Sequence, residues 1–348
     1  MDKKKLVLSI IFTLLVVLVL YSVNNTKTSY AAGDTLAEVV KNLATTANCN
    51  AGASGVCKTN DTDYRYVGAN VNNYVKFNND MYRIIGVFSD NTHGVTGKEL
   101  VKLIRSRLLE VSTWGVNNGT DNATYQGYNN LWVDSSTPNV PKANLNILLN
   151  EYFLNKTDTS TTFGDCSNWN YYSKDNNYKN EDCSDIVGYG IDSSSRTYIE
   201  DAKWYLNGPT DFLTKENIYT CERGTNTTSC AVATNGASST TAKIGLMYSS
   251  DYLYASSYYS STDTSETNGS RYFGNKNWLY KGREWTQTPS ASDAYSSWFV
   301  RFGDTKSDSS ITSYSVRPTF YLKSNIYITG GDGSFDNPYT LGCDTCGS

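Results

Sequence analysis

Eight cysteines fall into four close pairs, and this spacing constrains the fold more than any other feature of the chain. The pairs are Cys49/Cys57, Cys166/Cys183, Cys221/Cys230 and Cys343/Cys346. The first three pairs each bracket a polar insertion without apolar anchors, so we expect a local disulfide within each pair. A short disulfide loop can stabilise a fold by ~2–3 kcal/mol, mainly by restricting the unfolded chain.

An apolar segment behind a lysine-rich start predicts export of the chain. Lys3, Lys4 and Lys5 precede the uncharged residues 6–23, and small residues around Ala31 suit cleavage by signal peptidase. Residues 1–31 are therefore predicted as a signal peptide, or otherwise as an uncleaved N-terminal membrane anchor. Because disulfides persist in oxidising compartments, the cysteine pairs support the same extracellular or cell-surface location. Membrane contact is expected only through this segment, if it is uncleaved.

The composition indicates a folded extracellular protein that does not bind nucleic acid. The formal net charge is −4, and no run of Lys or Arg after the leader offsets it, so a phosphate backbone would be repelled. The chain contains 28 tyrosines but only 18% charged residues. Tyrosine suits strands and half-wet surfaces, because its ring packs while its hydroxyl stays hydrated.

Apolar spacing divides the rest of the chain into three parts. Residues 32–62 are predicted as a stalk, with a short helix capped by Asp34 or Thr35 and then the first cysteine loop. Residues 63–342 form the expected main extracellular domain, and residues 343–348 form a C-terminal tail with a CxxC motif.

The main domain begins with the pattern of a β-hairpin. Strands are predicted at 74–77 and 81–88 around an Asn-Asn-Asp turn, followed by a strand at 100–105. Amphipathic helices are predicted at 143–154 and 198–206. The last third alternates short apolar runs with loops, and residues 303–315 are expected to be a polar connection.

Four segments in order resemble one class of bacterial proteins. They read NNYVKFNNDMYRIIGVF, KIGLMYSSDYLYA, NWLYKGREWTQTP and SVRPTFYLKSNIYITGGDGSFDNPYTLG. The segments are similar to uncharacterised secreted or surface proteins of Gram-positive gut bacteria, whose shared region is a domain of unknown function. The resemblance covers about residues 70–342. It implies a secreted or surface location and does not imply an activity.

The Trp-rich middle and the closing VRPTFYL strand also resemble, more remotely, the end of C-type-lectin-like domains. The branch suggested includes the formylglycine-generating enzymes. This resemblance implies an α+β fold with small antiparallel sheets, a few helices and long disulfide-cinched loops. It does not imply a function, because one fold supports many. The active-site motif of the formylglycine-generating enzymes is not reproduced here.

Aromatic residues close to acids predict a ligand-binding surface. The candidate ligand-binding residues are Asp251, Tyr252, Tyr254, Trp278 and Glu284. Aromatic faces can stack on sugars while carboxylates bind sugar hydroxyls. The alternative is burial, since large aromatics dominate protein cores, and we expect burial for Trp285 and Trp298. For the Tyr-rich segment 252–259 both interpretations stay open.

A glycine-rich segment near the C-terminus has a weak resemblance to a calcium loop. Asp332, Ser334 and Asp336 alternate, so their oxygens could converge on one calcium ion. The spacing and distal Glu of an EF-hand are absent. We therefore favour a turn between the last two strands, and we expect no cofactor other than this candidate calcium.

A single histidine limits the catalytic and metal chemistry of the chain. His93 lies in a loop-like setting, and neither a G-x-S-x-G nor an H-E-x-x-H motif is present, so we expect it to be a solvated loop residue. Cys343 and Cys346 have the spacing of redox and zinc sites, but zinc needs about four ligands and no second CxxC is nearby, so we expect a local disulfide between them. Paired carboxylates for glycoside hydrolysis remain open, since the many acids include chance pairs.

These features favour a non-catalytic surface module that binds glycans or proteins through Tyr-, Trp- and Asn-rich loops. The first alternative is an extracellular enzyme, either a carboxylate-based hydrolase or a distant oxidase of the formylglycine-generating type. The second alternative is a structural scaffold of the cell envelope or of a pilus.

Overall fold

The computed structural model describes residues 34–59, 62–113, 143–156, 189–211, 213–232, 237–257, 276–293, 296–301, 304–309 and 312–347. The chain divides into the units Met1–Gly33 and Asp34–Ser348, and every described residue belongs to the second. The predicted leader and the predicted Cys166–Cys183 disulfide lie outside the described residues. Among the helices that the structure describes, none has the length and apolar character needed to cross a membrane.

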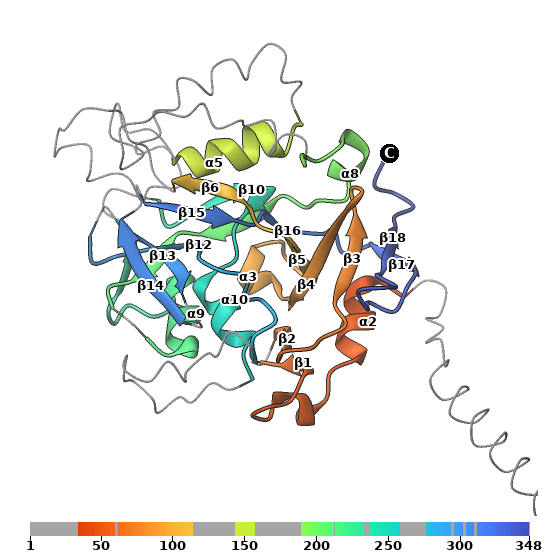
Figure 1. Ribbon diagram of the computed structural model, residues 1–348, viewed down its shortest axis with the longest axis horizontal. Coiled ribbons are helices and arrows are strands. Elements are labelled where there is room, and N and C mark those ends of the chain that lie inside the picture. The colour runs from red at the N-terminus through yellow and green to blue at the C-terminus, as the bar shows by residue number, and fades with distance from the viewer. Residues whose placement is uncertain are drawn as a thin grey trace, which may run out of the picture. The chain divides into compact units, whose positions relative to one another are not determined.

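The largest described sheet has seven strands (Figure 1). Its order is β1 (Gly55–Lys58), β2 (Tyr64–Val67), β4 (Asp80–Phe88), β5 (Leu100–Arg105), β16 (Thr319–Tyr321) and β11 (Ile244–Gly245), and β3 (Tyr74–Phe77) also pairs with β4. All these pairs are antiparallel. Because β16 comes from the end of the chain and lies beside β5, this sheet depends on long-range pairing.

The predicted hairpin and the strand that follows it are confirmed as β3, β4 and β5. Asn78 and Asn79 connect β3 to β4 with φ values of 52° and 58°. Asparagine tolerates this left-handed conformation better than most residues, and it suits the twist of a tight hairpin. Every residue of β5 is buried, which is typical of a strand covered on both faces.

A second sheet has five strands, in the order β14 (Asp304–Ser309), β13 (Ser296–Arg301), β12 (Glu284–Pro289), β15 (Ser313–Val316) and β6 (Leu109–Thr113). The β12–β15 pair is parallel and the others are antiparallel. The prediction of a polar connection at 303–315 is therefore wrong, since β14 and β15 lie there. As an edge strand, β14 can be mostly polar, because charged and polar edges prevent strand-to-strand aggregation.

Three two-stranded sheets complete the described strands. They pair β7 (Ala202–Tyr205) with β10 (Ser239–Ala242), β8 (Asn207–Pro209) with β9 (Cys230–Val232), and β17 (Tyr327–Gly330) with β18 (Thr340–Gly342). The helix predicted at 198–206 is wrong, because β7 lies there. Its burial alternates, with Ala202 and Trp204 buried and their neighbours half-buried, which fits a strand rather than a helix.

The predicted stalk is part of the compact unit. Thr35 and Glu38 form a reciprocal capping box at the start of α2 (Leu36–Asn42), which confirms the predicted helix. The α2 helix buries its apolar face, the 3₁₀ helix η1 (Thr46–Cys49) follows, and β1 joins the seven-stranded sheet. The stalk is therefore corrected to an integral layer, because its apolar residues have a sheet to pack against.

The remaining described helices are short. They are α3 (Asp90–His93), α5 (Asn144–Ile147), the π-helix η2 (Leu148–Phe153), α8 (Ser193–Arg196), α9 (Lys215–Glu222) and α10 (Ser249–Tyr254). The predicted helix at 143–154 is confirmed as α5 and η2. Figure 1 shows α5 across the end of the unit where β6 and β15 lie.

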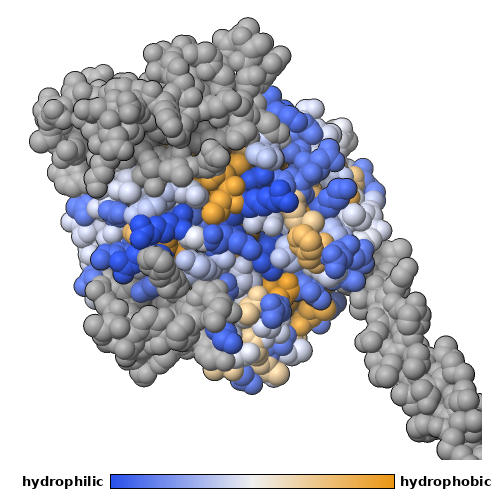
Figure 2. Space-filling view, viewed as in Figure 1, coloured by the Kyte–Doolittle hydropathy of each residue, from blue (hydrophilic) through white to orange (hydrophobic). Residues whose placement is uncertain are grey.

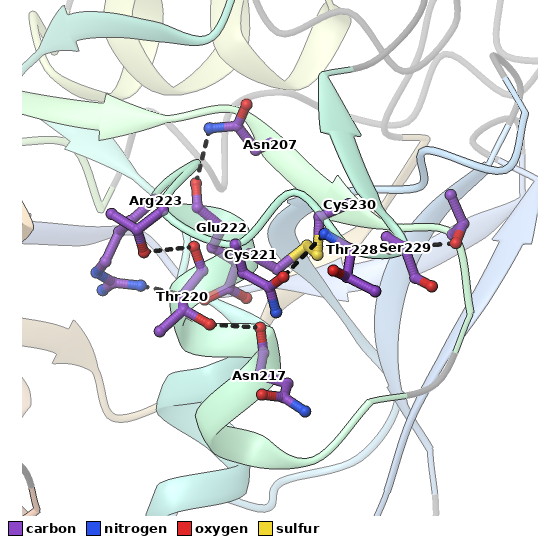
Figure 3. Close-up of a disulfide and its surroundings, with 12 residues drawn as sticks. Asn207, Asn217, Thr220, Cys221, Glu222, Arg223, Thr228, Ser229 and Cys230 are labelled. Carbon is purple, nitrogen blue, oxygen red and sulfur yellow. Dashed lines mark hydrogen bonds and ion pairs between the residues drawn. A yellow bond between two sulfur atoms is a disulfide. The ribbon is translucent and has the colours of Figure 1, made fainter.

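Three predicted disulfides are confirmed: Cys49–Cys57, Cys221–Cys230 and Cys343–Cys346. The second joins the end of α9 to β9, and Figure 3 shows Asn207 and Arg223 beside it. The Asn207 side chain donates a hydrogen bond of 3.1 Å to the Glu222 carbonyl, which satisfies an orphan acceptor at the helix end. The architecture is thus α+β, with small, mainly antiparallel sheets and local disulfides.

Candidate functional site

The five predicted ligand residues lie in the core. Asp251, Tyr252 and Glu284 are 0% exposed, and Tyr254 and Trp278 are 4% exposed. This placement corrects the predicted exposed surface, since a ligand in solution cannot stack on buried rings. Of the Tyr-rich segment 252–259, Tyr252 and Tyr254 belong to helix α10 (Ser249–Tyr254), and residues 258 and 259 lie outside the described residues. The predictions that Trp285 and Trp298 are buried are confirmed.

Asp251 forms a buried ion pair with Lys102 of β5. Lys102 Nζ lies 2.5 Å from Asp251 Oδ2, and both side chains are 0% exposed. Four aromatic rings lie 4.5–5.6 Å from Nζ: Phe88, Trp204, Tyr248 and Tyr321. Burial lowers the pKa of Lys102 to about 8, although the Asp251 carboxylate opposes this change. Burial raises the pKa of Asp251, but positive charges, Lys102 first, outweigh it and leave that pKa below its ordinary value.

Glu284 forms a second buried ion pair, with Arg317. Arg317 Nε lies 2.7 Å from Oε2, Nη2 lies 2.5 Å from Oε1, and Nη2 also donates to the Leu279 carbonyl at 2.6 Å. Burial raises the pKa of Glu284, and the Arg317 charge opposes this change. Such a bidentate pair fixes β12 to the segment before β16 and leaves the carboxylate no room for a ligand.

Trp278 and Tyr254 each lie against an arginine. The Arg83 guanidinium is 4.4 Å from the Trp278 ring and 4.2 Å from the Tyr74 ring. The Arg65 guanidinium is 4.6 Å from the Tyr254 ring. These cation–π contacts, like the bond from Trp278 Nε1 to the main chain, assign both aromatic residues to packing.

Glu222 is a further buried acid, which the sequence did not single out. Ser250 and Thr288 donate to its carboxylate, and Arg223 lies 3.3 Å away. Burial raises the pKa of Glu222, and Arg223 is the main opposing influence. In a sequence, a charged residue inside an apolar run indicates a buried charge network, and Lys102 in LVKLIR is such a residue.

His93 is buried, which corrects the prediction of a solvated loop residue. It ends α3, and its Nδ1 accepts a bond of 3.2 Å from the Val95 amide. The Nε2–H therefore donates to the Phe88 carbonyl at 3.0 Å. Burial lowers the pKa of His93, so the neutral ring is the favoured form. A neutral histidine with both nitrogens bonded to the main chain has a structural role.

The candidate calcium segment forms a self-bonded turn between β17 and β18. Asp332 Oδ1 accepts from the Ser334 amide at 2.9 Å, and Ser334 Oγ accepts from the Asn337 amide at 3.1 Å. Asp336 is exposed at the tip. These are the bonds of an Asx-type turn. Within the described part of the chain, no group of three or more His, Cys, Asp or Glu residues could hold a metal ion.

A surface cavity of about 850 Å³ lies at the end of the β3–β4 hairpin, beside the β17–β18 loop. We call it the hairpin cavity. It is lined by Lys76, Asn78, Asn79, Asp80, Met81, Arg107, Lys156, Tyr189, Gly190, Asp192, Phe335, Asp336, Asn337, Pro338 and Thr340. Phe335 is 63% exposed and Tyr189 is 45% exposed, the two highest values among the large exposed hydrophobic residues described. Where Figure 2 is coloured, the face it shows is mostly hydrophilic, with separate hydrophobic areas.

The two aromatic residues of the hairpin cavity are held in place by neighbours. The Arg105 guanidinium lies 4.1 Å from the Tyr189 ring, and Arg105 also bonds Asp80 at 2.6 Å. Phe335 meets Tyr74 edge to face, with ring centroids 5.4 Å apart. A ligand would therefore meet aromatic surfaces whose orientation is already set.

The charges around the hairpin cavity are only partly paired. Lys156 pairs with Asp192 at 2.6 Å, and Asp80 pairs with Arg105. Lys76 and Arg107 are exposed, and among the described residues neither has an ion-pair partner. The cavity therefore combines aromatic, amide and cationic groups.

A smaller cavity of about 220 Å³ lies beside the Cys49–Cys57 disulfide. Tyr254 lines it together with Lys215 and Ser256, so one predicted ligand residue does reach a described cavity, although it is 4% exposed.

Comparison of the chain with protein-family models, curated proteins and solved structures found no match.

Proposed function

We propose that this chain is a non-catalytic, C-type-lectin-like binding module outside the cell, and that it binds a glycan in the hairpin cavity. One observation carries the proposal: two exposed aromatic rings, Tyr189 and Phe335, line the same polar cavity of about 850 Å³. Both rings are oriented by contacts with neighbouring side chains. Three local disulfides support an extracellular location. Membership of the Gram-positive surface-protein class remains part of this proposal.

The chemistry of the hairpin cavity fits a saccharide. An aromatic face can cover the apolar face of a sugar ring, while the Asn79 and Asn337 side chains offer amide donors and acceptors to its hydroxyls. Lys76 and Arg107 add positive charge, which favours a sugar that carries a carboxylate.

The same geometry favours binding over hydrolysis. A glycosidase needs one carboxylic acid that keeps its proton and one that does not. Asp80 and Asp192, two of the acids that line the cavity, are paired with Arg105 and Lys156. Each of these two carboxylates is therefore already bonded to a cation of the protein.

A glycan array of neutral and uronic-acid-containing oligosaccharides tests the proposal, followed by titration calorimetry with the best ligand. Phe335→Ala is expected to weaken binding by about tenfold, the loss that one aromatic contact of ~1.4 kcal/mol predicts. Leu43→Ala is the matched control, because Leu43 is also an exposed hydrophobic residue but does not line the cavity. Absence of glycan binding, or equal loss in both variants, would refute the proposal.

A further inference from the structure

One ion pair among the described residues holds a lysine amine against a carboxylate with both side chains fully buried. Of the described pairs between a lysine and an acid, Lys102–Asp251 alone has both side chains 0% exposed. The other lysine pairs have side chains that are 20–62% exposed. The buried Glu284–Arg317 pair differs in kind, because a guanidinium keeps its proton and is no nucleophile.

We propose that Lys102 and Asp251 condense to an intramolecular isopeptide bond that joins β5 to α10. Nζ lies 2.5 Å from Oδ2, so it is held next to Cγ, the carbon it would attack. Holding two reacting groups in contact can raise their effective concentration to about 10⁵ M or more. Asp251 Oδ1 is buried and has no hydrogen-bond partner among the described residues, whereas Oδ2 accepts from Lys102 and from the Tyr248 amide.

The reaction proceeds from the neutral pair, and the surroundings of Nζ bring Lys102 closer to that form. Four aromatic rings exclude water from Nζ, and water removal penalises charged groups more than neutral ones. The lowered pKa of Lys102 agrees with this view, because a desolvated lysine becomes a better nucleophile. The Glu222 carboxyl is near enough to interact electrostatically with both partners and can hold a proton during the transfer.

The reaction balances without any further reagent. One proton passes from the Lys102 ammonium to the Asp251 carboxylate, and the free amine forms the Nζ–Cγ bond. A second proton passes from the nitrogen to the oxygen that leaves, the C–O bond breaks, and one water molecule is released. The product is a neutral secondary amide, which removes two buried charges from the core. It would also connect residues 149 positions apart in the chain.

Mass spectrometry of the purified full-length chain tests this inference without any variant. After reduction of the disulfides, trypsin is expected to leave Lys102 uncleaved and to yield residues 99–105 joined to residues 244–271. The mass of this species should equal the sum of the two peptides minus one water. The pair Lys156–Asp192 is the internal control, since its atoms are 2.6 Å apart but both side chains are about 40% exposed. Cleavage after Lys156 should be complete.

Two variants distinguish a covalent isopeptide bond from an ion pair. Lys102→Arg keeps a positive charge and should yield no joined peptide, whereas Asp251→Asn should yield the same joined peptide by loss of ammonia. Full cleavage after Lys102 in the wild-type chain, with both peptides free, would overturn the proposal and show that the pair is only ionic. Retention of the joined mass in Lys102→Arg would also overturn it, because another residue would then carry the link.

Discussion

Removal of the Glu284 charge should be among the most destabilising single changes in this fold. Glu284→Gln keeps the side-chain shape but leaves the Arg317 guanidinium, which is 0% exposed, without its carboxylate partner. Two of the bonds made by Arg317 end on that carboxylate, at 2.7 and 2.5 Å. Breaking a buried ion pair by removing one partner costs about 3–5 kcal/mol, so we expect a loss of this size.

Urea unfolding with the disulfides intact measures the loss as a lower midpoint at an unchanged slope. Asp201→Asn is the matched control, because its pair with Lys243 has a similar distance of 2.9 Å but Asp201 is 62% exposed. An exposed pair contributes about 0–1 kcal/mol. The double variant Glu284→Gln/Arg317→Met should recover much of the stability, since it removes both charges. A loss below about 1 kcal/mol in Glu284→Gln would refute the reasoning that the pair is desolvated.

Three further changes test other parts of the structure. Burial lowers the pKa of His93, so protonation favours the unfolded chain and the free energy of unfolding should fall as pH drops below about 6.5. His93→Gln should flatten that dependence in urea titrations at several pH values, and an unchanged slope would contradict it. Gly208→Ala should lower the free energy of unfolding by ~1–3 kcal/mol, because the new Cβ would lie 1.7 Å from the Pro289 carbonyl oxygen. An unchanged stability in thermal unfolding would be inconsistent with this contact. Replacing both Cys49 and Cys57 by serine should lower the free energy of unfolding by ~2–3 kcal/mol in the same assay. A gain in stability would contradict the assigned pairing.

Local patterns predicted the elements whose causes are local. The capping box at Thr35, the Asn78–Asn79 hairpin turn and the close cysteine pairs each depend on residues within a few positions of one another. The helix predicted at 198–206 failed because β7 is set by its partner β10, which lies more than thirty residues away. The prediction of an exposed ligand site was wrong for a related reason. In the sequence, aromatic residues near acids have the same pattern whether they form a binding surface or a core.

The hairpin cavity could not be predicted, because its wall comes from distant segments. Tyr189 and Phe335 meet the β3–β4 turn only after β17 and β18 pair beside β3, and no local spacing links these residues. The buried charges had a signal, a lysine or arginine within an apolar run. That signal does not name the partner, since Asp251 is 149 residues from Lys102.

The sequence alone predicted the three described disulfides, the first helix and the hairpin, because each depends on residues close together in the chain, and short loops close at low entropic cost. It also predicted the extracellular location, which the described disulfides are consistent with. Only the tertiary structure decided which acids are buried with a cation and which aromatic rings remain exposed. Burial depends on what the rest of the chain places around a residue, and the groups that surround Lys102 include Trp204, Asp251 and Tyr321, all about a hundred residues or more further along the chain.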